Sequence, residues 1–102
     1  MVLLSAHNDA EFESIINSPK STIVMFKDDG CGQCKNIKPS FLRRAQKYKD
    51  KQFLIMDFHD IQNLKVRNAI KGMPTFTKYK SGKKLTTFEG ADKPRLDHMI
   101  KY

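Results

Sequence analysis

The stretch from Gly30 to Pro39, Gly-Cys-Gly-Gln-Cys-Lys-Asn-Ile-Lys-Pro, constrains the fold of this chain more than any other feature. It holds both cysteines of the sequence, Cys31 and Cys34, which are separated by two residues. An apolar run typical of a buried strand, residues 22–26, precedes it, and a long helical pattern follows it. A strand that delivers Cys-x-x-Cys to the first turn of a helix is typical of a dithiol active site, because a helix N-terminus favours a thiolate.

Two alternatives to a catalytic dithiol stay open at this point. A tetrahedral zinc site needs four ligands, and beside the cysteines the sequence offers only three scattered histidines, His7, His59 and His98. A purely structural disulfide would close a very short loop and would stabilise the fold little through chain entropy. The sequence therefore favours a redox-active dithiol that needs neither metal nor cofactor.

Apolar patterns along the chain predict alternating strands and helices in a single domain over residues 1–102. The predicted elements are a short strand at 2–4, a helix at about 8–17 capped by Asn8, a strand at 21–27, a helix from Cys31 to about Tyr48 with Pro39 inside it, a strand at 52–57, a weaker helix at 60–70, strands at 75–80 and 85–88 joined by a hairpin at Ser81-Gly82, and a last helix capped by Asp92. Early βαβ alternation gives parallel strands and the hairpin gives antiparallel ones. The predicted class is therefore α/β, with a central mixed β-sheet flanked by helices on both faces.

The charge of the chain is strongly basic and uneven. The net charge is +8; residues 1–30 carry five acidic and two basic residues (−3), and residues 31–102 carry six acidic and 17 basic residues (+11). The positive charge is most simply interpreted as a solvated surface that keeps the domain soluble. A more specific interpretation is that the protein prefers an acidic protein partner. Direct nucleic-acid binding is less favoured, because the lysines are scattered and no nucleic-acid motif accompanies them.

The location expected from the sequence is cytoplasmic. No apolar run approaches the roughly 20 residues of a membrane helix, and no membrane partner is expected. Residues 1–9 lack the basic and long apolar segments of a signal peptide. In a reducing compartment, a lone cysteine pair is more often catalytic than structural.

Several motifs, taken at their joint spacing, resemble those of the thioredoxin family along essentially the whole chain. They are Cys31-Gly32-Gln33-Cys34-Lys35 with Pro39 five residues after the second cysteine, Met73-Pro74-Thr75-Phe76 ahead of the hairpin, Gly82 within the hairpin, and Gly90 before the last helix. The resemblance implies a thioredoxin fold and the reduction of protein disulfides by thiol–disulfide exchange.

The resemblance also implies roles for particular residues. Cys31 would attack and Cys34 would resolve, and Pro74 would be a cis proline beside the dithiol. The residues expected to contact the substrate are Gly30, Met73 and Pro74, and those expected to tune the redox chemistry are Gly32, Gln33, Met25 and Lys35. The implied partners are disulfide-containing protein substrates and a recycling enzyme similar to thioredoxin reductase.

Three positions depart from the family pattern. The tryptophan that usually precedes the first cysteine is Gly30, and the chain contains no tryptophan. The proline that usually precedes the second cysteine is Gln33. The buried aspartate of the preceding strand, which in the family helps to deprotonate the second cysteine, aligns with Met25, which we expect to fill core space. These changes bear on redox potential and rate more than on the type of reaction.

Other functions remain open from sequence alone. An oxidase or isomerase similar to a protein disulfide isomerase domain is one, because that class carries a polar histidine at the position of Gln33. A non-enzymatic thioredoxin-fold subunit that binds another protein is a second. Glutaredoxin-like chemistry with glutathione, or a shared iron–sulfur cluster, is a third, and Gly32-Gln33 is not the usual glutaredoxin pair.

Overall fold

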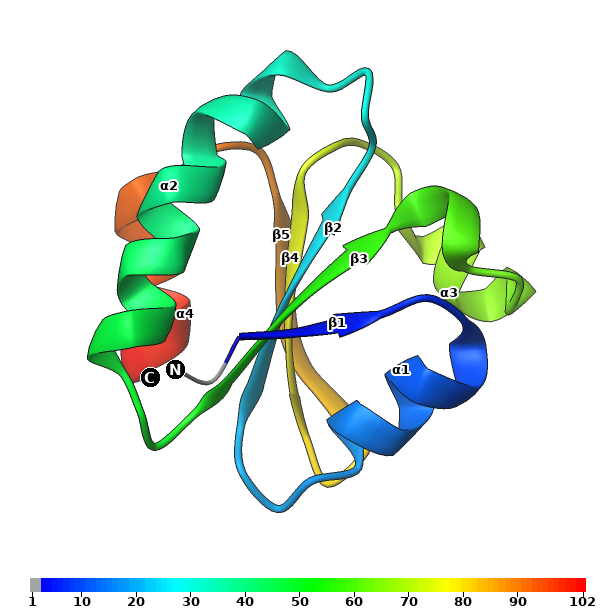
Figure 1. Ribbon diagram of the computed structural model, residues 1–102, viewed down its shortest axis with the longest axis horizontal. Coiled ribbons are helices and arrows are strands. Elements are labelled where there is room, and N and C mark those ends of the chain that lie inside the picture. Colours follow the sequence, from blue (N-terminus) through cyan, green and yellow to red (C-terminus); the bar gives the residue numbers. More distant parts are fainter. Residues whose placement is uncertain (1–2) are drawn as a thin grey trace.

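A computed structural model describes residues 3–102 and confirms the predicted order of elements (Figure 1). The elements are β1 (Leu3–Ala6), α1 (Asp9–Ile16), β2 (Thr22–Lys27), α2 (Gly32–Lys47), β3 (Gln52–Asp57), a 3-10 helix η1 (Phe58–Asp60), α3 (Leu64–Ala69), β4 (Thr75–Lys80), β5 (Lys83–Glu89) and α4 (Lys93–Lys101). The first predicted strand began at Val2, which lies outside the described residues, and β1 continues beyond Leu4 to Ala6.

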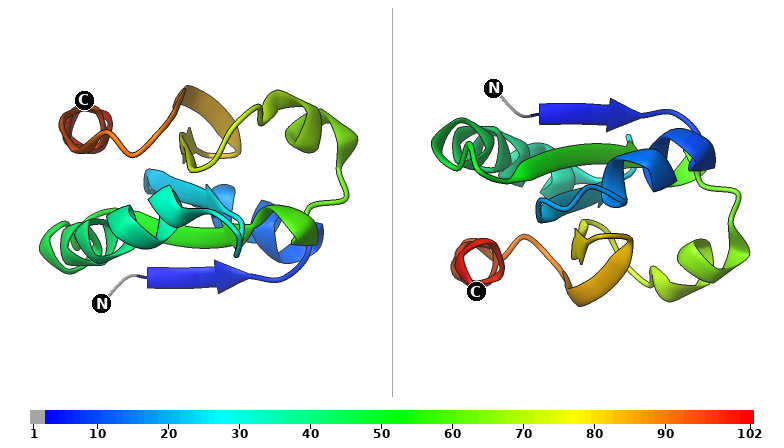
Figure 2. Two further views of the ribbon diagram at one scale, coloured as in Figure 1. Left: turned by 90° about the horizontal axis from the view of Figure 1, so that it is seen from above. Right: turned by 90° about the horizontal axis from the view of Figure 1, so that it is seen from below.

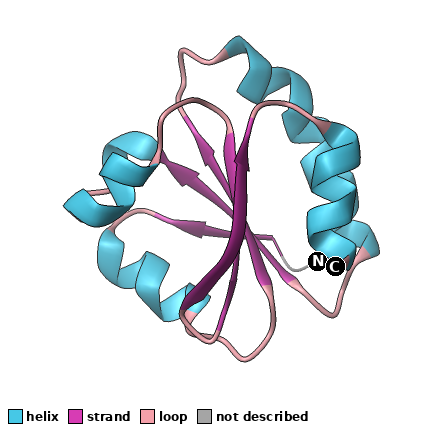
Figure 3. Cartoon of the chain, turned by 180° about the vertical axis from the view of Figure 1, so that it is seen from behind, coloured by secondary structure: helices cyan, strands magenta, loops and turns pink. Residues whose placement is uncertain are grey.

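The strands form one sheet over these residues, in the order β1-β3-β2-β4-β5. The pairs β1–β3 and β3–β2 are parallel, and the pairs β2–β4 and β4–β5 are antiparallel, so the sheet is mixed as predicted. Helices α2 and α4 cover one face and α1 and α3 cover the other, as Figure 1 and the view from behind in Figure 3 both show. Seen from above and from below, β1 and β5 lie at opposite edges of the sheet (Figure 2).

Side chains at the predicted caps start the helices. The Oδ1 atom of Asn8 accepts the amide of Glu11 at 2.8 Å, and the side chain of Asp92 accepts the amide of Arg95 at 3.1 Å. Each bond satisfies one of the amide donors that the first turn of a helix leaves free. Pro94 fits the first turn of α4, where a missing amide costs nothing.

The predicted helix at 60–70 is the main difference between sequence and structure. Asp57 accepts the amide of His59 and starts the short η1 turn, and the buried Ile61 follows in an extended conformation. Asn63 then caps a new helix by accepting the amides of Lys65 and Val66. The helix within the predicted range is therefore shorter than predicted and begins at Leu64, and the separate η1 turn precedes it, because Asp57 and Asn63 each cap their own short helix.

The sheet separates two apolar clusters. Side chains from β2, β3, β4, α2 and α4 form one cluster, which includes Cys34, Phe41, Phe53, Phe76 and Leu96. The other includes Phe12, Val24, Phe26, Ile61 and Tyr79 and lies under α1 and α3. The alternating sequence of β4 does not mark a solvent-facing side, because this strand lies between β2 and β5 and is buried from Thr75 to Tyr79.

The topology brings three chain segments to one end of the sheet. β2 and β3 are parallel and end together, with Lys27 opposite Asp57. β4 is antiparallel to β2 and begins at this end, with Thr75 opposite Phe26. The turn that carries the cysteines, the η1 turn and the segment before β4 therefore lie close to one another.

Candidate active site

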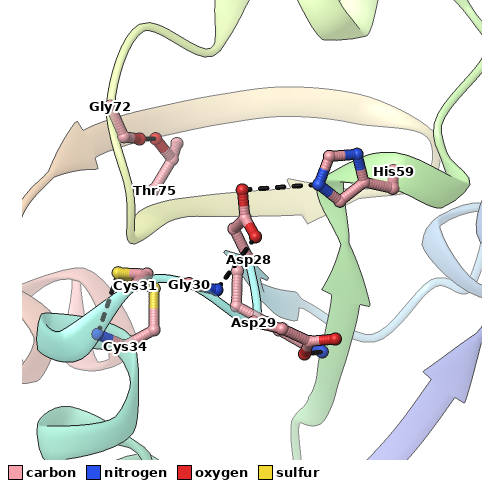
Figure 4. Close-up of a disulfide and its surroundings, with 9 residues drawn as sticks. Asp28, Asp29, Gly30, Cys31, Cys34, His59, Gly72 and Thr75 are labelled. Carbon is pink, nitrogen blue, oxygen red and sulfur yellow. Dashed lines mark hydrogen bonds and ion pairs between the residues drawn. A yellow bond between two sulfur atoms is a disulfide. The ribbon is translucent and has the colours of Figure 1, made fainter.

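The two cysteines lie where β2 passes into α2. Cys31 is the N-cap of α2, and its Sγ atom accepts the amide of Cys34 at 3.1 Å. The two residues are joined by a disulfide, and their Cα atoms are 5.3 Å apart (Figure 4). Cys34 is only 3% exposed, whereas Cys31 is half-buried and borders solvent. The structure therefore presents one outer and one inner sulfur at a helix N-terminus.

The segment before β4 borders the same site. The bond between Met73 and Pro74 is cis, as the resemblance implied. Gly90 donates its amide to the carbonyl of Pro74 at 2.8 Å, which ties this segment to the end of β5. Cys31 and Met73 are both half-buried and pack against the same apolar cluster. Met73, one of the expected substrate-contacting residues, thus borders the same cluster as the outer cysteine, whereas Pro74 is itself buried.

A cavity of about 160 Å³ lies beside the inner cysteine. Met25, 1% exposed, forms part of its wall together with Cys34 and Ile55, so the position of the family's aspartate is filled by an apolar side chain. Lys35 also lines this cavity, as does Lys38 one turn further along α2.

The remaining expected residues lie on the outer side of the turn. Gly30, Gly32 and Gln33 are exposed, and a Cβ atom built on Gly32 would meet no atom within 4 Å. A Cβ on Gly30 would meet only the Oδ1 atom of Asp28, at 3.9 Å. Neither glycine is required by packing within the chain, and both leave the approach to Cys31 open.

A network of charged side chains beside the dithiol was not predicted. The ammonium of Lys27 lies 2.8 Å from Asp29 Oδ1 and 3.1 Å from Asp57 Oδ2. The bond to Asp29 raises the pKa of Lys27. Desolvation favours a higher pKa for Asp57, but bonds from the His59 amide and from Lys27 outweigh it and lower that pKa. The Lys27–Asp57 contact was detectable in principle, because both residues end neighbouring parallel strands.

His59 is one of the three scattered histidines of the sequence, and its side chain is 67% exposed. Its Nε2 atom nevertheless lies 3.4 Å from Asp28 Oδ2, in the turn before Cys31 (Figure 4). No pattern in the sequence signals this contact, because it joins two turns that only the sheet order brings together.

The part of the chain that the structure describes gathers no group of three or more His, Cys, Asp or Glu residues suited to a metal ion. Within residues 3–102, no helix has both the length and the apolar character needed to cross a membrane.

Comparison with known proteins agrees with the fold and the dithiol. The thioredoxin family model matches residues 3–102. Thioredoxin of Gallus gallus is 39% identical over 99 residues, which span 95% of this chain and 94% of that protein. Thioredoxin of Equus caballus is 39% identical over 92 residues, 88% of each chain. The crystal structure of reduced Schistosoma mansoni thioredoxin pre-protein superposes with a TM-score of 0.90 at 31% identity, covering 99% of this chain and 97% of that one.

The fold and the cysteine pair define a dithiol thiol–disulfide oxidoreductase. The chain belongs to the thioredoxin family, and its activity is the reduction of protein disulfides. Membership implies protein substrates that contain disulfides and a reductase that recycles the dithiol.

Proposed function

We propose that Cys31 is the attacking thiol of this protein-disulfide reductase and that Cys34 is the resolving thiol. The observation that carries the assignment is the difference in burial between the half-buried Cys31 and the 3% exposed Cys34. A protein disulfide approaching from solvent meets the outer sulfur first. The free amides and the dipole of the first turn of α2 favour negative charge at that sulfur.

The reaction proceeds by two exchanges. The Cys31 thiolate attacks one sulfur of the substrate disulfide; a Cys31–substrate bond forms, the substrate S–S bond breaks, and the departing sulfur takes up a proton. Cys34 then loses its proton and attacks the Cys31 sulfur. The Cys31–Cys34 bond forms, the mixed disulfide breaks, and the second substrate sulfur leaves as a protonated thiol. Two electrons pass from the dithiol to the substrate.

The segment around Met73 and Pro74 docks the substrate in this proposal, and the open surface at Gly30 admits its backbone. Gly32 and Gln33 set the flexibility and polarity of the turn between the thiols. Met25 presents an apolar wall to the cavity beside Cys34, and Lys35 places a cation near the dithiol. These four residues, Gly32, Gln33, Met25 and Lys35, tune the redox potential and the rate.

In the cell, we assign the protein to electron transport from a thioredoxin-reductase-like enzyme to protein disulfides in the cytoplasm. A chain whose two cysteines form a single Cys-x-x-Cys pair suits a reducing compartment. The net charge of +8 supports acidic proteins as preferred partners.

Single cysteine variants test the two roles. With a small dithiol as electron source, the wild type reduces an accessible protein disulfide and C31S does not. C34S, which cannot resolve, accumulates a reductant-sensitive mixed disulfide with the substrate on a non-reducing gel. The double variant C31S/C34S is the control and forms no such adduct. Full activity of C31S, or adducts formed by C31S in place of C34S, would contradict the assignment.

A further inference from the structure

Asp28 holds the turn before the outer cysteine through three contacts. Its carbonyl oxygen accepts the amide of Cys31 at 3.0 Å, and its Oδ1 atom accepts the amide of Gly30 at 3.1 Å. Its Oδ2 atom lies 3.4 Å from Nε2 of His59. Figure 4 shows the carboxylate between the turn and the imidazole. One side chain thus connects the dithiol turn to the η1 helix.

His59 is itself held in place from its own side. Its amide donates to Asp57 Oδ1 at 2.9 Å, and its ring lies edge-on to Phe58 with centroids 6.0 Å apart. Arg67 of α3 lies over the Phe58 ring and donates to the carbonyl of Ile61 at 2.8 Å. The short η1 helix is therefore fixed to β3 and α3, and His59 can act on the dithiol turn from a fixed base.

The charge on Asp28 matters for the dithiol. A carboxylate in the turn before the N-cap of α2 opposes the formation of a thiolate on Cys31. A protonated imidazole paired with that carboxylate offsets its charge, and a neutral one does not. Histidine is the side chain whose ordinary titration, at about pH 6.5, falls in the range where this difference counts.

We propose that His59 is a positioning residue for the dithiol, which acts through Asp28 and sustains the reactivity of Cys31 as the pH falls below neutrality. The inference rests on the proposed role of Cys31 as the attacking thiol. The inference is carried by the Asp28–His59 pair. A protonated imidazole in this pair places a positive charge beside the carboxylate that flanks the reactive sulfur.

Other charged groups surround the pair from each neighbouring element. They are Lys27 on β2, Asp29 in the turn, Lys35 and Lys38 on α2, Asp57 on β3, Asp60 on η1 and Arg67 on α3. Lys27 is already engaged by Asp29 and Asp57, and histidine is the one residue type among these groups and the pair whose ordinary titration range lies near neutral pH.

Alkylation of the reduced protein by iodoacetamide, followed at about pH 6 and pH 7.5, measures the effect. H59Q keeps a hydrogen-bonding side chain without the charge. Because the two side chains are 67% and 38% exposed, solvent screens the pair, and we expect H59Q to react about threefold more slowly than the wild type near pH 6. The two proteins should react equally near pH 7.5. H59K keeps a positive charge at both pH values. It should react as fast as the wild type near pH 6 and faster than the wild type near pH 7.5.

The double variant D28N/H59Q separates this role from a general structural one. Without the carboxylate the histidine has nothing to offset, so D28N and D28N/H59Q should react at the same rate at both pH values. D60N, which removes a neighbouring carboxylate on η1, is the matched control and should keep the wild-type response to H59Q.

Equal rates for H59Q and the wild type at about pH 6, or an effect of H59Q that persists in the D28N background, would overturn the inference. Mass spectrometry of the alkylated protein identifies the modified cysteine. Modification of Cys34 before Cys31 would instead overturn the proposed function, and the inference with it.

Discussion

At the scale of single residues, Met25 is the position where this chain departs most in chemistry from the family pattern. It lies on β2 between Ile55 and Phe76 of the neighbouring strands and beside the cavity that Cys34 lines. The inner thiol therefore has no carboxylate on β2 to take its proton. The aspartate variant M25D tests what that absence costs.

M25D should lower stability and speed resolution. Desolvation at this buried position should raise the pKa of the new carboxyl group, because burial disfavours its charged form. The folded protein then binds more protons than the unfolded one above about pH 3.9, so the free energy of unfolding falls as pH rises toward the folded-state pKa. We expect a loss of about 2–4 kcal/mol near neutral pH from the polar burial and the lost packing.

Denaturant unfolding of M25D at acid and alkaline pH measures the loss of stability. The rate at which the Cys31–substrate mixed disulfide is released measures the change in resolution. M25L, which keeps an apolar side chain of similar volume, is the control and should change stability by less than about 1.5 kcal/mol. Unchanged stability of M25D at every pH would contradict the buried position, and slower or unchanged release would remove the proton-transfer role.

At the scale of helices and strands, the sequence predicted most boundaries because caps and apolar runs act locally. Asn8 and Asp92 each occupy the N-cap that their patterns predicted, and α2 begins directly after Cys31, where its pattern placed the start of a helix. The burial of β4 could not be predicted in this way, because it depends on the two strands and two helices that enclose the strand. Leu64, at the start of α3, is apolar but 70% exposed, because the short α3 does not bury it.

An ion pair between α2 and α4 was likewise invisible in the sequence, since its members lie 53 positions apart. Asp97 accepts bonds from Arg44 Nε at 2.6 Å and Arg44 NH2 at 3.0 Å. The hydrogen bond from Arg44 lowers the pKa of Asp97 below its ordinary value of 3.8. The pair is bidentate, but the Asp97 side chain is 41% exposed and solvent weakens the attraction.

We expect D97N to lower the free energy of unfolding by about 0.5–1 kcal/mol near neutral pH, after allowance for solvent screening. A carboxylate with a depressed folded-state pKa stabilises above its unfolded pKa, and that contribution is lost as the pH falls through the folded-state pKa. Denaturant unfolding at about pH 7 and pH 2 should therefore show a gap between wild type and D97N that closes in acid. D92N, which keeps a good N-cap on the same helix, should show no such gap. A gap that persists at the lower pH would mean that the effect of D97N is not electrostatic.

At the scale of the whole molecule, the candidate site is a product of sheet order. The cysteines could be assigned from the sequence because strand, turn and helix are contiguous there. The contact of Asp28 with His59 could not, because it requires β2 and β3 to be parallel neighbours that end together. Met73 and Pro74 were placed by resemblance to the family rather than by their own local pattern.

The overall charge leads to a prediction about substrate choice. The net charge is +8, and Lys35 and Lys38 are exposed on α2 close to the dithiol. Asp28 and Asp29 line the same cavity as these two lysines and carry the opposite charge. If the field of the whole chain governs encounter, a disulfide peptide flanked by acidic residues will be reduced faster than the same peptide flanked by basic ones.

We expect the acidic peptide to react about tenfold faster than the basic one at roughly 10 mM salt, where charges interact over about 30 Å. At about 1 M salt charges interact over only about 3 Å, and the difference in rate should shrink to about twofold. The variant K35Q/K38Q removes the two local cations and leaves a net charge of +6, by subtracting two from +8. Most of the advantage should survive in this variant, because the remaining positive charge is spread over the molecule. Loss of the advantage in K35Q/K38Q would assign the preference to the two lysines beside the dithiol, and a faster basic peptide would show that Asp28 and Asp29 dominate the approach to Cys31.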